Sequence, residues 1–345
     1  MIMMLWVSIL ALSTLLYVLL DGFDLGVGIL FAFTSDEADR RRMLSAISPV
    51  WDGNETWLVI AGTVLFGAFP KAFAILLSSF YLPIILMVGA LILRGVAFEF
   101  RYKTVAFRWV WNVSFALGSV LATFVQGLVI GALVRGVPIV DGYYAGGPFG
   151  WFSLFACLCG VGLCLGYALL GAAWLVGKTE GALRKHAYGL LPVLAIGVGC
   201  FLAIAFVYAL VLDLRIMGRW IERPYLLIFP AIGIAATHWL VRSILRHDDF
   251  QPFRLVCLVF AAAFGTLAVS FWPYMIPFSL TIQDALAPES SLRFMFPAGV
   301  IVLPLICAYS ATVYWVFRGK VRDETYESPA PVIVDYSSTY PENRK

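Results

Sequence analysis

The chain has 345 residues, of which 61% are hydrophobic and only 13% are charged, and its formal net charge is +3. About a quarter of the residues in a soluble globular domain are charged, so this composition excludes a water-soluble fold. It predicts an all-α integral membrane protein, and the small net charge gives no indication of a nucleic-acid partner.

Nine apolar segments are predicted to cross the membrane, since about 20 apolar residues span the hydrocarbon core as a helix. The first is longer than a signal-peptide core and has neither a basic flank nor a cleavage motif, so we expect it to be retained. Residues 1–318 should therefore form one polytopic domain, and the polar residues 319–345 a disordered tail. The expected spans are 4–31, 51–69, 73–98, 111–134, 151–176, 189–212, 225–245, 254–277 and 296–317.

The segments between these spans alternate in charge. Basic residues mark every second connection and the tail, at 40–42, 101–108, 178–185, 242–254 and 318–322. The connection at 213–224 is the exception, because Arg215, Arg219 and Arg223 there are only partly balanced by Asp213 and Glu222. Short basic loops stay in the cytoplasm. This pattern predicts a periplasmic N-terminus and a cytoplasmic C-terminus, which an odd number of spans requires.

Two carboxylates lie within the first span, in the sequence D-G-F-D-L-G-V-G. Asp21 and Asp24 are three residues apart and therefore share a helix face. An ionisable side chain at this depth is a functional candidate by default, because lipid offers it no partner. Gly22 and Gly26 form a G-x-x-x-G step, which lets a neighbouring helix approach closely.

The second acidic pair opens span two, in W-D-G-N-E-T-W-L. Asp52 and Glu55 are again three residues apart, and Asn54 lies between them. An acidic residue at a helix start can simply cap the helix, so a structural role stays open for Asp52.

The third polar cluster closes span three, in R-G-V-A-F-E-F-R-Y-K. It contains Arg94, Glu99, Arg101 and Lys103. Arg101 and Lys103 can snorkel to the membrane surface. Arg94 lies deeper, and we expect a carboxylate of span one or two as its partner. Such a convergence suits a proton path, and it equally suits a cation site in a transporter.

The sequence offers few ligands for haem or metal. Of the three histidines only His238 lies within a span, and it is expected to be a buried hydrogen-bonding residue. A bis-His haem needs two facing histidines. The six cysteines lie in apolar runs without paired spacing, which favours buried packing over metal binding. No catalytic, cofactor-binding or metal-ligating residue is therefore predicted in this chain.

These motifs closely resemble those of subunit II of cytochrome bd-type ubiquinol oxidases. The resemblance runs from about residue 15 to residue 320. It rests on D-G-F-D-L-G-V-G at 21–28, P-V-W-D-G-N-E-T-W-L at 49–58, L-F-G-A-F-P at 65–70 and R-G-V-A-F-E-F-R at 94–101. Further segments look similar to the cyanide-insensitive branch, namely Y-A-G-G at 144–147, W-L-V-G-K-T-E-G at 174–181 and W-P-Y-M-I-P at 272–277.

The resemblance implies a fold of two four-helix bundles plus one peripheral helix, in the bacterial cytoplasmic (inner) membrane. It implies that the complex oxidises quinol and reduces dioxygen to water with cytoplasmic protons. Subunit I, the partner, would hold two haems b and haem d. This chain would bind no haem. A bound quinone, membrane lipid and a small accessory subunit are its other possible partners.

The resemblance also assigns roles to particular residues. Asp52 matches an aspartate implicated in the proton path, Asp21 and Asp24 match the family's D-G-F-D pair, and Arg94 matches its deep arginine. Lys103 matches a basic residue near the cytoplasmic entrance. Glu99 replaces an aspartate seen in other members. The full set of proton-path candidates is Asp21, Asp24, Asp52, Glu55, Arg94, Glu99 and Lys103.

Two alternatives remain beside the oxidase subunit. A proton- or cation-coupled secondary transporter would also need carboxylates in the membrane, but it predicts a polar substrate site at broken helices. The prolines at 192, 230 and 304 have no such polar cluster around them. A purely structural subunit, whose carboxylates only pair with Arg94, is the other alternative.

Overall fold

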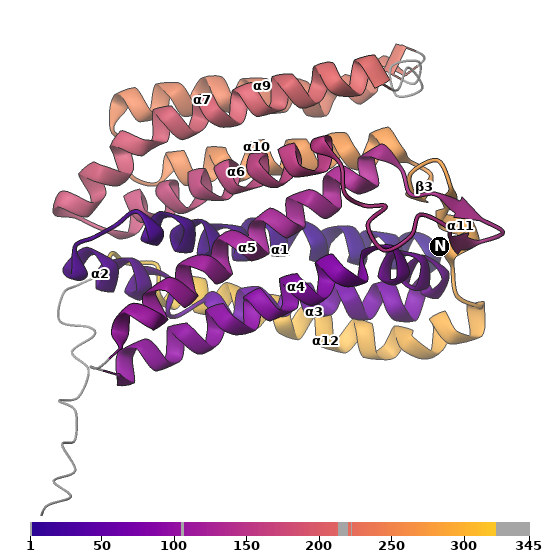
Figure 1. Ribbon diagram of the computed structural model, residues 1–345, viewed down its shortest axis with the longest axis horizontal. Helices are drawn as coiled ribbons and strands as arrows, with labels where there is room; N and C mark the ends of the chain where they lie inside the picture. Colours follow the sequence, from indigo (N-terminus) through magenta and orange to yellow (C-terminus); the bar gives the residue numbers. More distant parts are fainter. Residues whose placement is uncertain (1, 105–106, 213–219, 222, 322–345) are drawn as a thin grey trace, which may run out of the picture.

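The computed structural model describes residues 2–104, 107–212, 220–221 and 223–321. Nine helices of 18 residues or more lie within these ranges, and all of them run roughly parallel to one long axis (Figure 1). They are α1 (Ile2–Ala32), α3 (Trp51–Ala68), α4 (Pro70–Lys103), α5 (Arg108–Arg135), α6 (Leu154–Lys178), α7 (Gly181–Leu212), α9 (Ile228–Arg246), α10 (Gln251–Phe271) and α12 (Glu289–Val316).

The predicted spans correspond one to one with these helices. Eight helices in the described part of the chain are long and apolar enough to cross a membrane, and α3 is the expected span that is not among them. The polar residues at the start of α3 explain this difference, because they lower the mean hydropathy of an 18-residue helix. Several boundaries also differ: α7 begins at Gly181 and α12 at Glu289, both earlier than predicted.

Short elements connect the spans at the two ends of the molecule. The helix α2 (Glu37–Ile47), capped by the Asp36 side chain, occupies a segment that was expected to be a loop. The other short elements are η1 (Pro224–Leu227), α11 (Ile282–Ala285) and two hairpins, β1 (Ile139–Val140) with β2 (Tyr143–Tyr144) and β3 (Tyr274–Ile276) with β4 (Leu280–Thr281). Figure 1 shows α2 at one end of the bundle, and β3 and α11 at the other end with the N-terminus.

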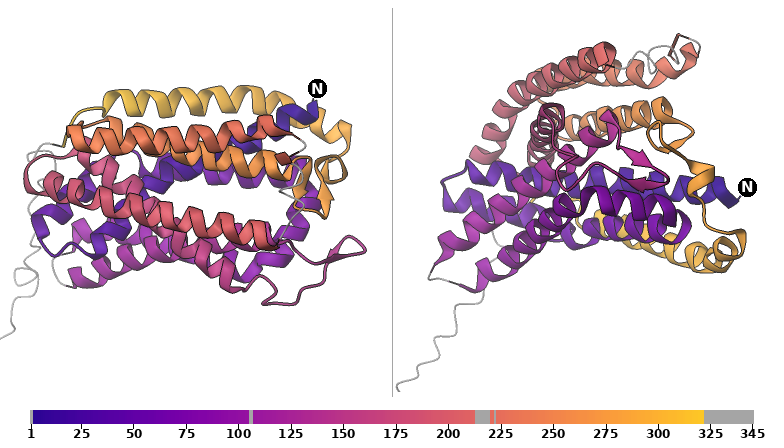
Figure 2. Two further views of the ribbon diagram at one scale, coloured as in Figure 1. Left: turned by 90° about the horizontal axis from the view of Figure 1, so that it is seen from above. Right: turned by 45° about the vertical axis from the view of Figure 1, so that its right-hand side comes forward.

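The long helices form two groups of four and one outlier. In the first group α1 and α4 each contact α3 and α5, and in the second group α6 and α9 each contact α7 and α10. The two groups meet where α6 lies against α1 and α5. The helix α12 packs along α3 at the outer edge, as the views in Figure 2 show. This arrangement agrees with the expected pair of four-helix bundles and peripheral helix.

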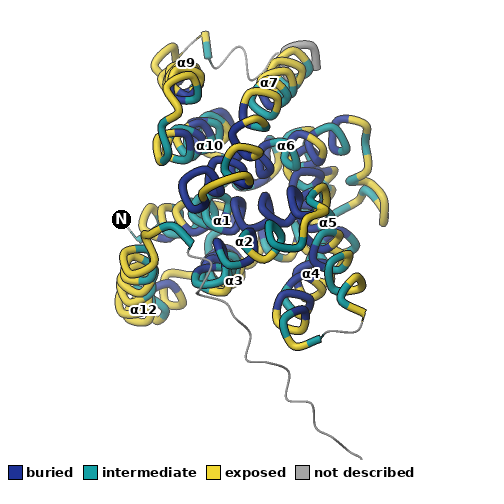
Figure 3. Tube along the Cα trace, turned by 90° about the vertical axis from the view of Figure 1, so that its left-hand side faces the viewer, coloured by how far each residue is buried: buried dark blue, intermediate teal, exposed yellow. Residues whose placement is uncertain are grey.

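Burial is concentrated where the two groups meet. In the end view of Figure 3 the buried residues gather around α1, α5 and α6, while α12 and α9 are mostly exposed. The second half of α1 is buried on all sides, from Asp21 to Phe31. The apolar residues that face outward on α9 and α12 can contact lipid without a free-energy cost, because lipid tails are as apolar as leucine.

The closest helix contact is between α1 and α6. A Cβ atom at Gly26 would lie 1.8 Å from the backbone oxygen of Tyr167, and one at Gly171 would lie 2.5 Å from the carbonyl carbon of Gly26. Both positions therefore require glycine. The predicted close approach at the G-x-x-x-G step is confirmed, with α6 as the neighbouring helix.

The C-terminal end of α12 is fastened to the second group of helices. Lys178 Nζ donates to the carbonyl oxygens of Phe317 and Gly319, and Val321 N donates to Lys178 O at 2.8 Å. Lys320 Nζ lies 2.9 Å from Asp249 Oδ2, and this contact lowers the pKa of the Asp249 carboxyl. Residues 319–321 are thus part of the folded domain, and the rest of the predicted tail lies outside the described residues.

We expect Gly26→Ala to weaken the fold strongly. The methyl group must push α1 and α6 apart, and overpacking of this kind lowers the free energy of unfolding by about 1–3 kcal/mol. Thermal unfolding in detergent would measure the loss. The matched control is Gly89→Ala on α4, where a Cβ atom meets nothing within 4 Å; equal melting temperatures for the two variants would contradict the prediction.

Candidate functional site

A row of buried polar side chains follows one face of α1. Tyr17, Asp21 and Asp24 are spaced by four and three residues, so they lie on the same side of the helix. Both aspartates are 0% exposed. The neighbouring helices α3, α4, α5 and α6 bring polar side chains to this row, and together they form the buried polar cluster described below.

Arg94 of α4 is the cation of the buried polar cluster. Its Nη2 atom lies 2.9 Å from Asp21 Oδ1 and 3.5 Å from Glu55 Oε2. The expected partner of Arg94 is therefore present, and both carboxylate-bearing helices supply one. Gly118 of α5 leaves room for this arrangement, because a Cβ atom there would come within 3.1 Å of Arg94 Cβ.

Asn54 connects the second aspartate to the peripheral helix. Its Nδ2 atom donates to Asp24 Oδ2 at 2.7 Å and to the backbone oxygen of Leu20 at 3.2 Å. The hydroxyl of Tyr314, on α12, donates to Asn54 Oδ1 at 2.8 Å. The amide orientation of Asn54 is thus determined on both sides.

A third branch extends the cluster between α1, α5 and α6. Gln126 Nε2 donates to the Tyr17 hydroxyl at 2.7 Å, and the Tyr167 hydroxyl donates to Gln126 Oε1 at 3.1 Å. No pattern in the sequence indicated these residues or Tyr314. Gln126 could have been found as a lone amide within an apolar span, whereas tyrosines are too common in membrane helices to be distinctive.

The seven predicted candidates divide into two sets. Asp21, Asp24, Glu55 and Arg94 come together in the buried polar cluster. The other three side chains are exposed on the surface of the chain. Asp52 lies in the first turn of α3, where its backbone oxygen accepts a hydrogen bond from the Thr56 hydroxyl. Glu99 and Lys103 lie near the end of α4, and Lys103 Nζ is 5.8 Å from the centre of the Phe100 ring.

A second polar group lies at the end of the bundle, beside α2. Arg101 was expected to snorkel, but it is only 2% exposed. Its Nη2 lies 2.8 Å from Glu37 Oε1, and its Nε donates to Asn112 Oδ1 at 2.6 Å. Arg108 Nη1 also lies 3.3 Å from Glu37 Oε1. Arg101 therefore fastens α2 to α4 and α5.

The histidines and cysteines do not form a ligand set in the described part of the chain. No group of three or more His, Cys, Asp or Glu residues there could hold a metal ion. His238 is exposed on α9, so the expectation that it is buried is wrong. The reason is that α9 is a peripheral helix with only three buried residues, Ala236, Leu240 and Ser243.

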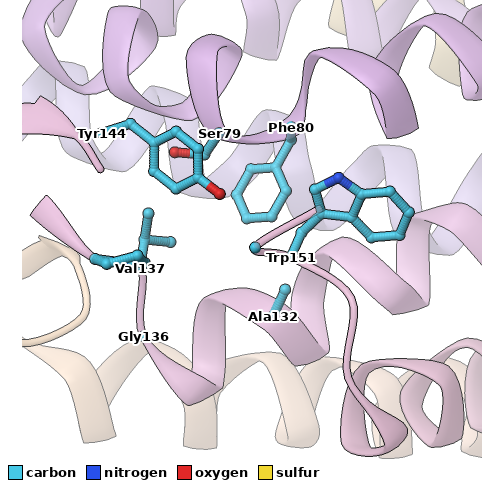
Figure 4. Close-up of a pocket in the computed structure, with 9 residues that line it drawn as sticks. Ser79, Phe80, Ala132, Gly136, Val137, Tyr144 and Trp151 are labelled. Atoms are coloured by element: carbon cyan, nitrogen blue, oxygen red, sulfur yellow. The ribbon is translucent and has the colours of Figure 1, made fainter. Parts of the chain in front are cut away.

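A small pocket near the hairpin β1–β2 contains no charged side chain. Figure 4 shows Phe80, Val137 and Trp151 around it, with the hydroxyls of Ser79 and Tyr144 on one side. Both hydroxyls donate to backbone oxygens, those of Ile75 and Gly147. This pocket therefore offers no carboxylate, whereas the buried polar cluster contains Asp21, Asp24 and Glu55.

Comparison with known proteins identifies the family. Residues 2–317 match the family model described as cytochrome bd terminal oxidase subunit II. The chain is 30% identical to cytochrome bd-I ubiquinol oxidase subunit 2 of Escherichia coli (strain K12), covering 89% of this chain and 92% of the relative. It is also 30% identical to cytochrome bd ubiquinol oxidase subunit 2 of Bacillus subtilis (strain 168), covering 92% and 96%.

A solved structure supports the fold. A chain of the bd oxidase from Geobacillus thermodenitrificans superposes with a TM-score of 0.75 at 19% identity, covering 92% of this chain and 98% of that one. The matched family model extends over residues 2–317 and so includes every helix that contributes to the buried polar cluster. The chain therefore belongs to the cytochrome bd terminal oxidase subunit II family.

Proposed function

We propose that this chain is the haem-free subunit II of a respiratory quinol oxidase, and that it helps to deliver protons from the cytoplasm. Family membership makes it a subunit of an oxidoreductase complex and a multi-pass protein of the inner membrane. Two relatives are named ubiquinol oxidase subunits, which supports quinol as the substrate of the complex. The haems b and haem d then belong to subunit I, against which this chain packs.

The orientation follows from the distribution of charge. The basic segments at α2, at the junctions α4–α5, α6–α7 and α9–α10, and after α12 lie at one end of the bundle, as the ion pairs of Arg101 with Glu37 and of Arg184 and Lys320 with Asp249 illustrate. The positive-inside rule assigns this end to the cytoplasm. The N-terminus is then periplasmic and the C-terminus cytoplasmic.

One observation supports the proton-delivery proposal: a fully buried carboxylate lies next to a second carboxylate that is partly exposed at the surface of the chain. Asp21 is fully buried, and Arg94, which contacts both carboxylates without itself relaying a proton, holds it beside Glu55, whose side chain is 28% exposed. Asp52 is exposed one helical turn away, at the same end of α3. Reducing dioxygen to water consumes protons, and titratable groups linked by water are the means of moving them through a membrane domain.

The haem-free assignment rests on the ligands available in the chain. A b-type haem is commonly held by histidine. His186 lies near the start of α7 and His247 directly after α9, both at the basic end of the bundle. His238 lies within α9, and its side chain is exposed. These positions do not face one another across a buried space. From the resemblance to the family we also propose that the complex contains a bound quinone and a small accessory subunit.

The transporter alternative is less well supported. Transporters of this kind bind substrate where helices are interrupted. Here α7 continues through Pro192 and α12 continues through Pro304. The one interruption inside a long described helix, at Phe80 of α4, has an uncharged pocket beside it and no carboxylate.

The oxidase assignment is tested by purifying the tagged chain gently from its native membrane and recording a reduced-minus-oxidised spectrum. We expect bands of haem b and haem d, carried by a larger co-purifying subunit. The same spectrum recorded after the subunits are separated should show no haem on this chain. A stable chain that purifies alone and without colour would contradict the assignment and favour the transporter.

Asp52→Asn should leave the complex assembled with an unchanged haem spectrum and lower its quinol oxidase turnover. The reason is that an exposed carboxylate beside Glu55 can collect protons and an amide cannot; positioned proton-transfer groups contribute about 10²–10⁴-fold. Oxygen consumption would measure the effect. Glu289→Gln, at the opposite end of the bundle, is the control because the ion pair of Glu289 with Arg293 is exposed to solvent. Unchanged turnover in Asp52→Asn would favour the purely structural role.

Asp21→Ala should reduce the amount of assembled complex. Removing the carboxylate leaves the guanidinium of Arg94 buried with only the longer contact to Glu55, and breaking a buried pair costs about 3–5 kcal/mol. The yield of complex with an intact spectrum would measure this loss. The double variant Asp21→Asn/Arg94→Met removes both charges and should recover assembly but not turnover; recovery of both would show that the pair is only structural.

A further inference from the structure

A groove lies between α3 and the peripheral helix α12. The start of α3 and the end of α12 meet at the basic end of the bundle, since the two helices run in opposite directions along each other (Figure 1). We call this feature the α3–α12 groove. It is lined by Pro49, Gly53, Asn54, Tyr309, Ser310 and Tyr314.

The inner wall of the α3–α12 groove belongs to the buried polar cluster. Tyr314 and Asn54 line the groove, and they are joined to each other by a hydrogen bond of 2.8 Å. Asn54 in turn donates to Asp24 Oδ2 at 2.7 Å. The fully buried Asp24 is therefore separated from the groove by one side chain.

Asp24 differs from the other carboxylates of the buried polar cluster. Asp21 and Glu55 both lie within 3.5 Å of Arg94. Arginine keeps its proton in proteins, so it cannot relay one, and each of these carboxylates must leave its ion pair to accept a proton. Asp24 instead receives a hydrogen bond from the neutral amide of Asn54 at 2.7 Å, so it can accept a proton without leaving an ion pair.

We propose that the α3–α12 groove is a second proton entrance, which supplies Asp24 and runs beside the route that begins at Asp52. The inference rests on the proposed role in proton delivery. A water molecule in the groove brings a proton, which adds to a carboxylate oxygen of Asp24 while the water remains behind. The neutral acid then donates this proton onward and returns to the carboxylate.

Tyr314 and Asn54 are positioning residues in this entrance. An amide does not carry protons at physiological pH, so Asn54 orients Asp24 and does not relay. The Tyr314 hydroxyl donates to Asn54 Oδ1, which leaves Nδ2 to face the aspartate. Without Tyr314 the amide can turn over, and an amide oxygen would then face a carboxylate.

The first test narrows the groove in the purified complex. A methyl group at Gly53 would lie 3.3 Å from Tyr309 Cε1, whereas one at Gly62 on the same helix meets nothing within 4 Å. We expect Gly53→Ala to slow proton uptake, measured with a pH indicator when the reduced complex reacts with dioxygen, by about two-fold or more, and to increase the solvent isotope effect. Gly62→Ala should behave as the unmodified complex does.

The second test distinguishes parallel entrances from a single one. Tyr314→Phe should lower turnover and change its pH profile while the haem spectrum stays intact, which a merely structural loss would not do. Combining it with Asp52→Asn closes both entrances, so the double variant should lose more activity than the product of the two single losses. Independent sites would simply multiply their effects.

The outcomes separate this inference from the proposed function. If Asp52→Asn is slow but Gly53→Ala and Tyr314→Phe match Gly62→Ala, the groove entrance is wrong and proton delivery through this chain stands. If the double variant is no slower than Asp52→Asn alone, the two residues belong to one route and the second entrance is likewise wrong. If Asp52→Asn, Asp24→Asn and the groove variants all keep full turnover, proton delivery by this chain is itself overturned.

Discussion

The buried ion pair between Arg94 and Asp21 is the constraint on which the first helix group depends. A charge inside a membrane domain is expensive unless it is paired or hydrated, so the helices that carry these two residues must stay in contact. Glu55 adds a third helix to the same contact. Three helices that begin and end at different points of the chain are thereby fixed in register, and their apolar surfaces pack around the pair.

The same constraint explains why glycines gather where they do. Charged and hydrogen-bonding side chains need space at the centre of the first helix group, and neighbouring backbones must come close to shield them from lipid. Gly26 and Gly171 bring α1 and α6 together, and Gly118 opens a place beside Arg94. Helix association in lipid depends on such close packing, because burying apolar surface gains little there.

Much of this structure could be predicted from the sequence. Hydropathy located all nine long helices, and the cost of buried charge correctly gave Arg94 a carboxylate partner. The sequence did not predict α2, whose charged first turns look like a loop until Met43, Leu44 and Ile47 pack against the bundle. It also misjudged Arg101 and His238, because burial of a residue near a helix end or on an outer helix depends on which neighbours the fold supplies. The Tyr314–Asn54 contact joins residues 260 positions apart, and no local pattern indicates such a pair.

The position of α12 has a consequence for how the protein is made. It is the last long helix of the described chain to leave the ribosome, it touches mainly α3, and its far end is held by Lys178. Until it arrives, the Asn54 side chain lacks the hydrogen bond from the Tyr314 hydroxyl. The polar centre is therefore incomplete until α12 has been inserted, so a chain cut before Glu289 would leave the Asn54 amide without this partner.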